Sequence, residues 1–509
     1  MLDHVRGPNF TCTNNRLFVQ MNRMPKHCGV FGDESSAARV ISFRDGPFLQ
    51  RVLILSDMRP DSPLWIRGVM ALCGILAGPA LLYAQTTKDI DAKTLREYAG
   101  VYRWGPNNFL YLQTWDEFSG FGKPRQLVAF DESGEVRTLY PTDHDQFISG
   151  PGMAVSTPVE SRITFQRDRR GNITTLTWQR DASRIRLARR VETEKREDVR
   201  FSNGDVQLAG TLASPTKSGK HPAIVLVHGS GAEDREYMLP WAHFLIRHGI
   251  AVLGYDKRGV GESTGDWNTA SFEDLAGDVV AAFEYLKTRR DIDPKQIGLL
   301  GISQAGWIMP RAAVRAKDVA FLISISGAGV TPAETTLDQA RNEMTMGGTP
   351  PQVVENIIAI LKLEYEYAKT GQGWEEYAAA REKMAARMGT PPDTIPGTPD
   401  HPYFQFIRRL YFYDPIPTLR ELKVPTLALW GELDNNILAE KNKKAWEKAL
   451  KEGGNNDYTL TILPKANHSQ WEAKVGSNAE AKSLQRFVAA YFTTINNWLA
   501  SRVRGFSVR

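Results

Sequence analysis

The sequence is poor in cysteine. Its 509 residues include only Cys12, Cys28 and Cys73, and all three precede residue 85. A chain that begins near residue 85 therefore contains no thiol, which excludes a disulfide, a cysteine nucleophile and a cysteine-ligated metal site from it. Any covalent chemistry in that part of the chain must come from other side chains.

The chain also lacks a strong charge of either sign. Its formal net charge is +5. Residues 1–84 contain nine Lys and Arg and six Asp and Glu, a net charge of +3, so residues 85–509 carry a net charge of only +2. The Arg-rich segment RDASRIRLARR (180–190) alternates polar and apolar residues, which is typical of a solvated strand face. We therefore expect no nucleic-acid partner. A charged fraction of 24% and a hydrophobic fraction of 42% are those of a globular protein, and the length suits two or three domains.

One uncharged apolar run lies near the cysteines. GVMALCGILAGPALLYA (68–84) has 17 residues and follows Arg67. As a helix rising about 1.5 Å per residue it is about 25 Å long, shorter than a hydrocarbon core of about 30 Å. A basic flank, a short apolar run and small Ala84 at its end are typical of a secretory signal peptide.

Signal peptides begin near an N-terminus, so we expect translation to start at Met58. Residues 1–57 are then an upstream extension with little structure, and residues 58–84 are the signal peptide. The mature protein is expected to be secreted or periplasmic, with no stable membrane anchor after cleavage. The alternative is that residues 68–84 form an internal membrane anchor.

Residues 90–195 have the pattern of a small antiparallel β-domain, curled or barrel-like. Strand-like segments rich in β-branched and aromatic residues include FLYLQTW, SRITFQR and ITTLTWQR. DESGE (131–135) and DRRGN (168–172) each place a glycine at an expected turn. The charged stretch VETEKREDVR (191–200) is the expected linker to the next domain. LREYAGVY (95–102) resembles the opening of small β-domains attached to some bacterial serine hydrolases and β-lactamase-like proteins.

Residues 196–509 predict an α/β domain. Apolar strand-like runs alternate with helical segments, and the runs lie at 223–229, 249–256, 296–303, 320–327, 425–432 and 458–464. The first five are almost continuously apolar, as strands buried on both faces are. The alternation predicts a mostly parallel sheet with helices on both faces. Residues 331–420 interrupt it with helical patterns, which predicts a helical cap over the carboxyl edge of the sheet, or else a solvated decoration.

Ser303 lies in GISQAG (301–306), which departs from the nucleophile pattern G-x-S-x-G by having Ala305 as the second small residue. It follows a predicted strand and precedes a predicted helix. A sharp strand-to-helix turn strains the serine backbone and exposes the hydroxyl, provided that small residues flank it. Gly301 and Ala305 meet that size requirement, so the segment predicts a nucleophile. Pro310 predicts a kink, or a helix whose regular part begins late.

Acyl transfer by a serine needs backbone N–H donors aimed at the developing oxyanion. One donor is expected from Gln304, directly after the serine. The second is expected from Ser230, in the glycine-containing loop VLVHGSGAEDR (225–235) that follows an earlier strand. His228 in this loop is expected to shape it rather than to act as the base.

A serine nucleophile also needs a histidine base that a carboxylate orients. Of nine histidines, His468 follows the last predicted strand on a loop, in LPKANHSQW. Asp434, in LALWGELDNNI, lies between the serine and the histidine after another predicted strand. Glu432 is its main rival, whereas Asp457 precedes the last strand and is expected at the opposite end of the sheet.

The chain order Ser303, Asp434, His468 resembles that of serine hydrolases with the α/β-hydrolase fold. The segments HGSG, YDKRGVGES (255–263), GISQAG, GELD and NH occur in that family's order, and the resemblance covers roughly residues 196–505. YDKRGVGES is similar to a loop of bacterial esterases, dienelactone-hydrolase-like enzymes and serine aminopeptidase-like hydrolases. The resemblance implies that Asp256 and Arg258 have structural roles, pairing and hydrogen bonding beneath the site.

The expected function is hydrolysis of a small-molecule carboxylic ester through an acyl-enzyme, with no metal or organic cofactor. A peptidase or amidase on the same residues is the alternative, and an aminopeptidase would use cap acids such as those in LEYEYAKTGQGWEEY (363–377). A non-catalytic binding protein on a hydrolase scaffold is a third hypothesis, of a different class.

Overall fold

The computed structural model describes residues 87–115, 126–388 and 397–506, all of which fall within one compact unit. The expected extension (1–57) and signal peptide (58–84) lie outside the described residues. Among the described helices, none combines the length and apolar character needed to cross a membrane.

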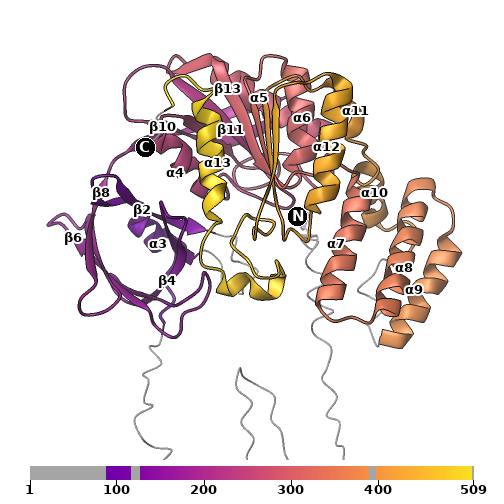
Figure 1. Cartoon of the computed structure of the whole chain (residues 1–509), viewed down its shortest axis with the longest axis horizontal. Coiled ribbons are helices and arrows are strands. Elements are labelled where there is room, and N and C mark those ends of the chain that lie inside the picture. Colours follow the sequence, from indigo (N-terminus) through magenta and orange to yellow (C-terminus); the bar gives the residue numbers. More distant parts are fainter. Residues whose placement is uncertain (1–86, 116–125, 389–396, 507–509) are drawn as a thin grey trace, which may run out of the picture. The chain divides into compact units, whose positions relative to one another are not determined.

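The expected antiparallel β-domain is a closed barrel of eight strands in sequence order (Figure 1). Its strands are β1 (Gly100–Gly105), β2 (Asn108–Trp115), β3 (Gln126–Asp131), β4 (Val136–Asp143), β5 (Gln146–Ser149), β6 (Ser161–Arg167), β7 (Ile173–Gln179) and β8 (Ile185–Val191). Pairing of β1 with β8 closes it. Helix α3 (Ala92–Tyr98), capped by Asp91, brings Tyr98 against Phe147 and Phe165 in the interior. Side chains fill this barrel, so its inside is a core.

The predicted linker at 191–200 is wrong. Strand β8 ends at Val191, and β9 (Glu194–Asn203) pairs along its whole length with β10 (Val206–Pro215). The charged composition has a simple cause, because β9 is the edge strand of the second sheet. Only Val199 and Phe201 of β9 are buried, and its other side chains face solvent wholly or in part.

The second sheet has eight strands in the order β16-β15-β14-β13-β11-β12-β10-β9. Its parallel strands are β11 (His221–Val227), β12 (Ala251–Tyr255), β13 (Ile292–Ile302), β14 (Leu322–Ile325), β15 (Thr426–Gly431) and β16 (Tyr458–Leu463). These are the six expected runs, with shifted ends. The prediction of a mostly parallel sheet is confirmed, and the hairpin β9–β10 adds its antiparallel edge.

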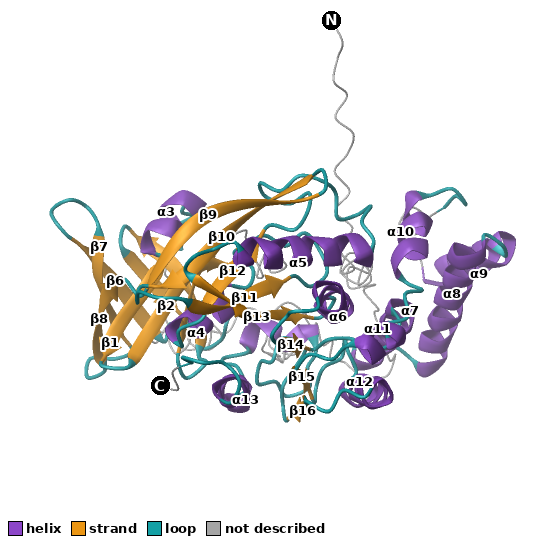
Figure 2. Cartoon of the chain, turned by 90° about the horizontal axis from the view of Figure 1, so that it is seen from above, coloured by secondary structure: helices purple, strands orange, loops and turns teal. Residues whose placement is uncertain are grey.

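Helices cover both faces of this sheet (Figure 2). Helices α5 (Phe272–Lys287), α6 (Ala305–Ala316) and α12 (Ala439–Gly453) lie on one face, and α4 (Leu239–Arg247) and α13 (Ala489–Ala500) on the other. Successive strand residues point to opposite faces. Val225 of β11 accordingly joins the apolar cluster of α5 and α6, while Leu226 joins that of α4 and α13. This double burial explains why the strand sequences are continuously apolar.

The chain between β14 and β15 is helical, as predicted for a cap. It contains α7 (Pro332–Met346), α8 (Pro351–Thr370), α9 (Trp374–Met388), α10 (Pro402–Leu410) and α11 (Ile416–Glu421). Asn342 of α7 donates a hydrogen bond to the carbonyl of Asn435, which lies in the loop after β15. The cap therefore contacts the carboxyl edge of the sheet.

Candidate active site

Ser303 occupies a sharp turn between β13 and α6. Its φ is +59°, a left-handed conformation that costs a non-glycine residue energy and is found mostly where function or packing requires it. The Ser303 N–H donates to the carbonyl of Ile325 at 2.9 Å, which fixes the turn to the end of β14. The predicted strain at the serine is confirmed.

Small residues allow this turn to form. A methyl group on Gly301 would lie 2.5 Å from the Ala305 Cβ and 2.7 Å from the Val227 carbonyl oxygen. A methyl group on Gly306 would lie 2.6 Å from the Cα of Gly327. The site therefore accepts alanine at position 305 but requires glycine at 301. Helix α6 begins at Ala305 and continues past Pro310, so the expectation of a late start is wrong.

Asp434 and His468 lie together at the carboxyl ends of β15 and β16. The Nδ1 of His468 is 2.9 Å from one carboxylate oxygen of Asp434 and 3.0 Å from the other. The Asp434 side chain has no exposed surface, whereas the imidazole is 20% exposed. Asp434 also accepts hydrogen bonds from the N–H groups of Asn436 and Ile437. The carboxylate is thus held in place, and it makes Nδ1 the donor, leaving Nε2 to accept a proton.

The two rival carboxylates have other partners. Glu432 accepts a hydrogen bond from the N–H of Lys465 at 2.9 Å. Asp457 precedes β16, at the opposite end of the sheet as predicted, and pairs with Arg502 at 2.6 Å. Only Asp434 of these three carboxylates bonds His468.

Ser326, which was not predicted from the sequence, links the serine turn to the histidine loop. Its hydroxyl donates to the carbonyl oxygen of His468 at 2.7 Å and accepts from Nε2 of Gln470 at 2.9 Å. Ser326 directly follows Ile325, the residue that accepts the Ser303 N–H. Two hydrogen bonds and one peptide bond therefore connect the Ser303 and His468 backbones. The available signal was a polar residue near the carboxyl end of the apolar run 320–327.

The two expected oxyanion donors remain open. Gln304 precedes the first residue of α6, and Ser230 lies exposed in the loop after β11. Within the described parts of the chain, neither backbone N–H donates to a protein acceptor. Both are therefore able to receive an anionic oxygen.

A buried lysine lies under these donors and was also missed. The Nζ of Lys257 donates to the carbonyl oxygens of Gly229 and Gly231 at 2.8 and 3.0 Å, and to Oε1 of Gln304 at 3.1 Å. Glu233 accepts from the Gly229 N–H at 2.8 Å. Burial lowers the pKa of Lys257 to about 8 and raises the pKa of Glu233 to about 7. The signal was a lysine between two residues already read as structural.

The remaining residues of these motifs are structural. Burial lowers the pKa of His228 to about 3, and its Nε2 bonds the carbonyl of Tyr255, so it is unsuited to be the base. Asp256 pairs with Arg235, and Arg258 pairs with Asp278, each at 2.7 Å. The predicted structural roles agree with these contacts, but Asp256 and Arg258 bind different partners and do not pair with each other.

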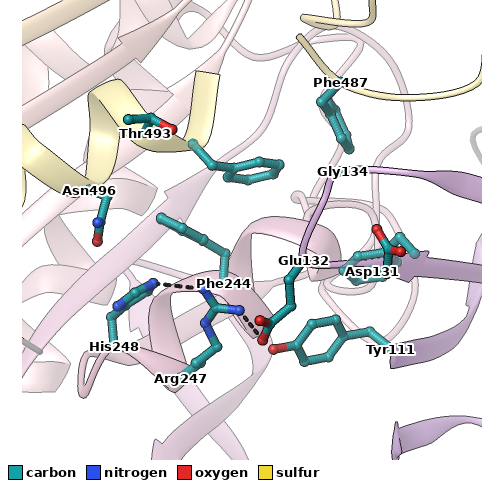
Figure 3. Close-up of a pocket in the computed structure, with 12 residues that line it drawn as sticks. Tyr111, Asp131, Glu132, Gly134, Phe244, Arg247, His248, Phe487, Thr493 and Asn496 are labelled. Atoms are coloured by element: carbon teal, nitrogen blue, oxygen red, sulfur yellow. Dashed lines mark hydrogen bonds and ion pairs between the residues drawn. The ribbon is translucent and has the colours of Figure 1, made fainter. Parts of the chain in front are cut away.

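A cavity of about 170 Å³ lies elsewhere, between the barrel and helices α4 and α13. Figure 3 shows Arg247 directed toward Glu132 and Tyr111 of the barrel, with Phe244 beside them. None of Ser303, Asp434 and His468 lines this cavity. Within the described ranges no three His, Cys, Asp or Glu side chains are grouped to hold a metal ion.

Comparison with known proteins identifies relatives for the second domain. Residues 224–475 match the model of the Alpha/beta hydrolase family. Esterase EstD of Thermotoga maritima is 25% identical over 269 residues, which are 51% of this chain and 57% of that protein. Thiohydrolase aneE of Aspergillus aculeatus is 34% identical over 137 residues, 26% of this chain and 42% of that protein. The chain thus spans about half the length of the relatives it matches.

A Pyrococcus furiosus esterase of known structure is 17% identical, with 61% of this chain and 91% of that chain aligned at a TM-score of 0.40. The strand order and the family match identify the fold. The chain has the α/β-hydrolase fold, and residues 224–475 are the part of it that matches the alpha/beta hydrolase family model.

Proposed function

We propose that this protein is a serine hydrolase that cleaves carboxylic esters of small molecules through an acyl-enzyme intermediate. One observation carries the proposal: the Asp434–His468 pair is tied through Ser326 to the strained turn that presents Ser303. The name of the relative from Thermotoga maritima, an esterase, supports the ester class.

In this mechanism Nε2 of His468 takes the proton of the Ser303 hydroxyl as the serine oxygen attacks the ester carbonyl carbon. The Gln304 and Ser230 N–H groups bind the oxyanion of the tetrahedral intermediate. His468 then gives its proton to the leaving alcohol oxygen, and the acyl-enzyme remains. Asp434 keeps the imidazole in the required tautomer and stabilises its cation.

Hydrolysis of the acyl-enzyme repeats these steps with water as the nucleophile. His468 takes a proton from the water as its oxygen attacks the acyl carbon. The Ser303 oxygen leaves and recovers its proton from His468, and the carboxylic acid is released. These steps use side chains and backbone groups of the chain and need no metal or organic cofactor.

The aminopeptidase alternative is weakened because the one buried acid of the cap segment 363–377 is already engaged. Glu364 is buried and accepts hydrogen bonds from the hydroxyls of Tyr377 and Tyr403. It is therefore not available to bind a substrate amine. Ester and amide panels measured side by side distinguish the two activities.

The test is turnover of a short-chain aryl ester by the wild-type chain and by Ser303→Ala. We expect Ser303→Ala to lose nearly all turnover while it still binds substrate, because the nucleophile is gone. Ser324→Ala is the matched control, since this buried serine lies on the neighbouring strand β14. Substantial turnover by Ser303→Ala would refute the assignment, and a wild-type chain that binds esters without cleaving them would indicate a binding protein.

We also propose that the mature protein is secreted or periplasmic after cleavage near Ala84. The support is the sequence pattern of residues 58–84. N-terminal sequencing of exported protein tests it, with a first residue close to Gln85 expected. A mature chain that begins well upstream of Gln85 would refute it.

A further inference from the structure

We propose that Lys257 is a positioning residue for the oxyanion site, which it builds by orienting and polarising the peptide group that carries the Ser230 N–H. This inference rests on the proposed function and names a residue outside the usual serine, histidine and acid set. Lys257 lies two residues after β12, and the residue is only 2% exposed.

The ammonium group is fully engaged. An ammonium has three N–H donors, and this one meets three acceptors, the carbonyls of Gly229 and Gly231 and the side-chain oxygen of Gln304. The two carbonyls flank Ser230 on either side. The third acceptor belongs to the residue expected to supply the other oxyanion donor. One cation therefore contacts both elements that form the oxyanion site.

The bond to Gly229 has a direct effect on Ser230. The Gly229 carbonyl and the Ser230 N–H belong to the same peptide group, which is trans, so the two point in opposite directions. Holding the carbonyl against Lys257 turns the N–H away from the lysine. A cation on the carbonyl oxygen also draws electron density from the amide, which makes the N–H a stronger donor.

The bond to Gln304 fixes the spacing between the two donors. The Gln304 N–H comes from the turn after β13, and the Ser230 N–H comes from the loop after β11. With its side-chain oxygen on Lys257, Gln304 is attached to the same point as the Ser230 loop. Preorganised donors of this kind are what stabilise a transition-state oxyanion.

A buried ammonium is an energetically unfavourable choice if its only role is to fill space in the core. Removing an ammonium from water is unfavourable, and an apolar side chain of similar length would avoid that cost. The groups that face Lys257 are the Glu233 carboxylate, the Asp278 carboxylate, the His228 imidazole and the Trp267 ring, the last at 5.4 Å. No carboxylate oxygen of these lies within ion-pair distance of Nζ in the described structure. The three acceptors are thus the direct hydrogen-bond partners of the ammonium.

The experiment compares wild type, Lys257→Met and the remote control Lys287→Met, whose lysine pairs with Asp318. Readouts are kcat and KM for the aryl ester and the inhibition constant of an aryl boronic acid, which forms a tetrahedral anionic adduct with an active serine. We expect Lys257→Met to lower kcat about 10- to 100-fold with KM within about twofold. The boronic acid should bind more weakly by the same factor as kcat/KM falls.

A folded Lys257→Met with unchanged kcat, or with reduced kcat and undiminished boronic acid affinity, would overturn the inference. Should that variant fail to fold, Gln304→Ala cuts one of the three bonds and keeps the backbone donor. It should lower kcat several-fold at constant KM, and an unchanged kcat would overturn the inference. A wild-type chain without ester turnover would instead remove the proposed function itself, so the two failures are distinguishable.

Discussion

Ser326 donates its hydroxyl hydrogen to the backbone carbonyl of His468 over 2.7 Å. The same hydroxyl accepts from Gln470, and the neighbouring Ile325 carbonyl accepts from Ser303. A single buried serine thus sets the position of the histidine loop relative to the nucleophile turn. Ser326 itself has a φ of +48°, a conformation that its partners must maintain.

Replacing Ser326 by alanine should therefore damage both stability and catalysis. The substitution leaves the Gln470 amide and the His468 carbonyl without this partner, at a cost of about 1–3 kcal/mol in the free energy of unfolding. We expect kcat to fall about tenfold, since a shift of the base of about 1 Å is enough for a loss of that order or more. Urea unfolding and ester kinetics measure the two effects.

Ser324→Ala provides the control for that substitution. Ser324 is also buried and lies on β14, two residues before Ser326, but its hydroxyl has no hydrogen-bond partner among the described residues. Its removal should leave kcat unchanged. Equal losses in the two variants would show that the hydrogen bond to His468 has no special role.

Asp434→Asn should reduce kcat by a factor of about 10³–10⁴, because an amide that donates to Nδ1 stabilises the wrong imidazole tautomer. Glu432→Gln should retain most of the activity, since that carboxylate accepts only the Lys465 N–H in the described structure. Steady-state kinetics of the two variants decide between the carboxylates. A larger loss in Glu432→Gln would reverse the assignment of the acid.

The barrel should contribute to catalysis through Trp115. Its indole N–H donates to the Tyr237 carbonyl at 3.1 Å, and its ring centre lies 6.4 Å from that of Trp471, three residues after His468. Trp115→Ala should cost about 3–5 kcal/mol of stability and also lower kcat, because the loop that carries His468 loses a packing partner. Urea unfolding and ester kinetics are the measurements.

Trp104→Ala is the control within the barrel. Trp104 packs on Trp178 and under Arg186, both barrel residues. Trp104→Ala should lower the free energy of unfolding but leave kcat of the folded fraction unchanged. If both tryptophan variants keep full kcat, the barrel has no part in positioning the histidine.

Glu364 should make the stability of the cap depend on pH. Burial raises the pKa of Glu364 from its ordinary value of 4.5 to about 7, so the folded protein holds the proton more tightly than the unfolded chain does. Protonation therefore favours folding, fully below the unfolded pKa, and this contribution disappears as the pH rises through about 7.

Glu364→Gln removes that titration. Its amide oxygen can still accept from one of the two hydroxyls, Tyr377 or Tyr403, and its NH2 group can donate to the other. As the pH rises from about 5 to 8, the Tm of wild type should fall relative to the Tm of Glu364→Gln. Thermal melts at matched ionic strength measure it. A difference that does not vary with pH would contradict a raised pKa.

The sequence predicted those parts of the fold and site that depend on local signals. Strands buried on both faces have continuous apolar runs in the sequence. Ser303 ends one such run, and Asp434 lies in the loop after another. His468 lies in the loop after the last predicted strand. The small residues around Ser303 indicated the strained turn for the same reason.

What the sequence did not predict depends on contacts between distant segments. Ser326 and Lys257 bond to residues far from them in the chain, His468 and Gly229 respectively, so their own sequence neighbourhoods could not indicate those partners. The charged segment 191–200 was misread because an exposed edge strand and a linker have the same composition.

The central claim is that Ser303 is an activated nucleophile, and covalent labelling tests it most directly. The purified chain is treated with a fluorophosphonate, digested, and mapped by mass spectrometry. A single adduct on Ser303, formed rapidly in wild type and far more slowly in His468→Ala, is the predicted result. An adduct on another residue, or an unlabelled Ser303 in a chain that still hydrolyses esters, would contradict it.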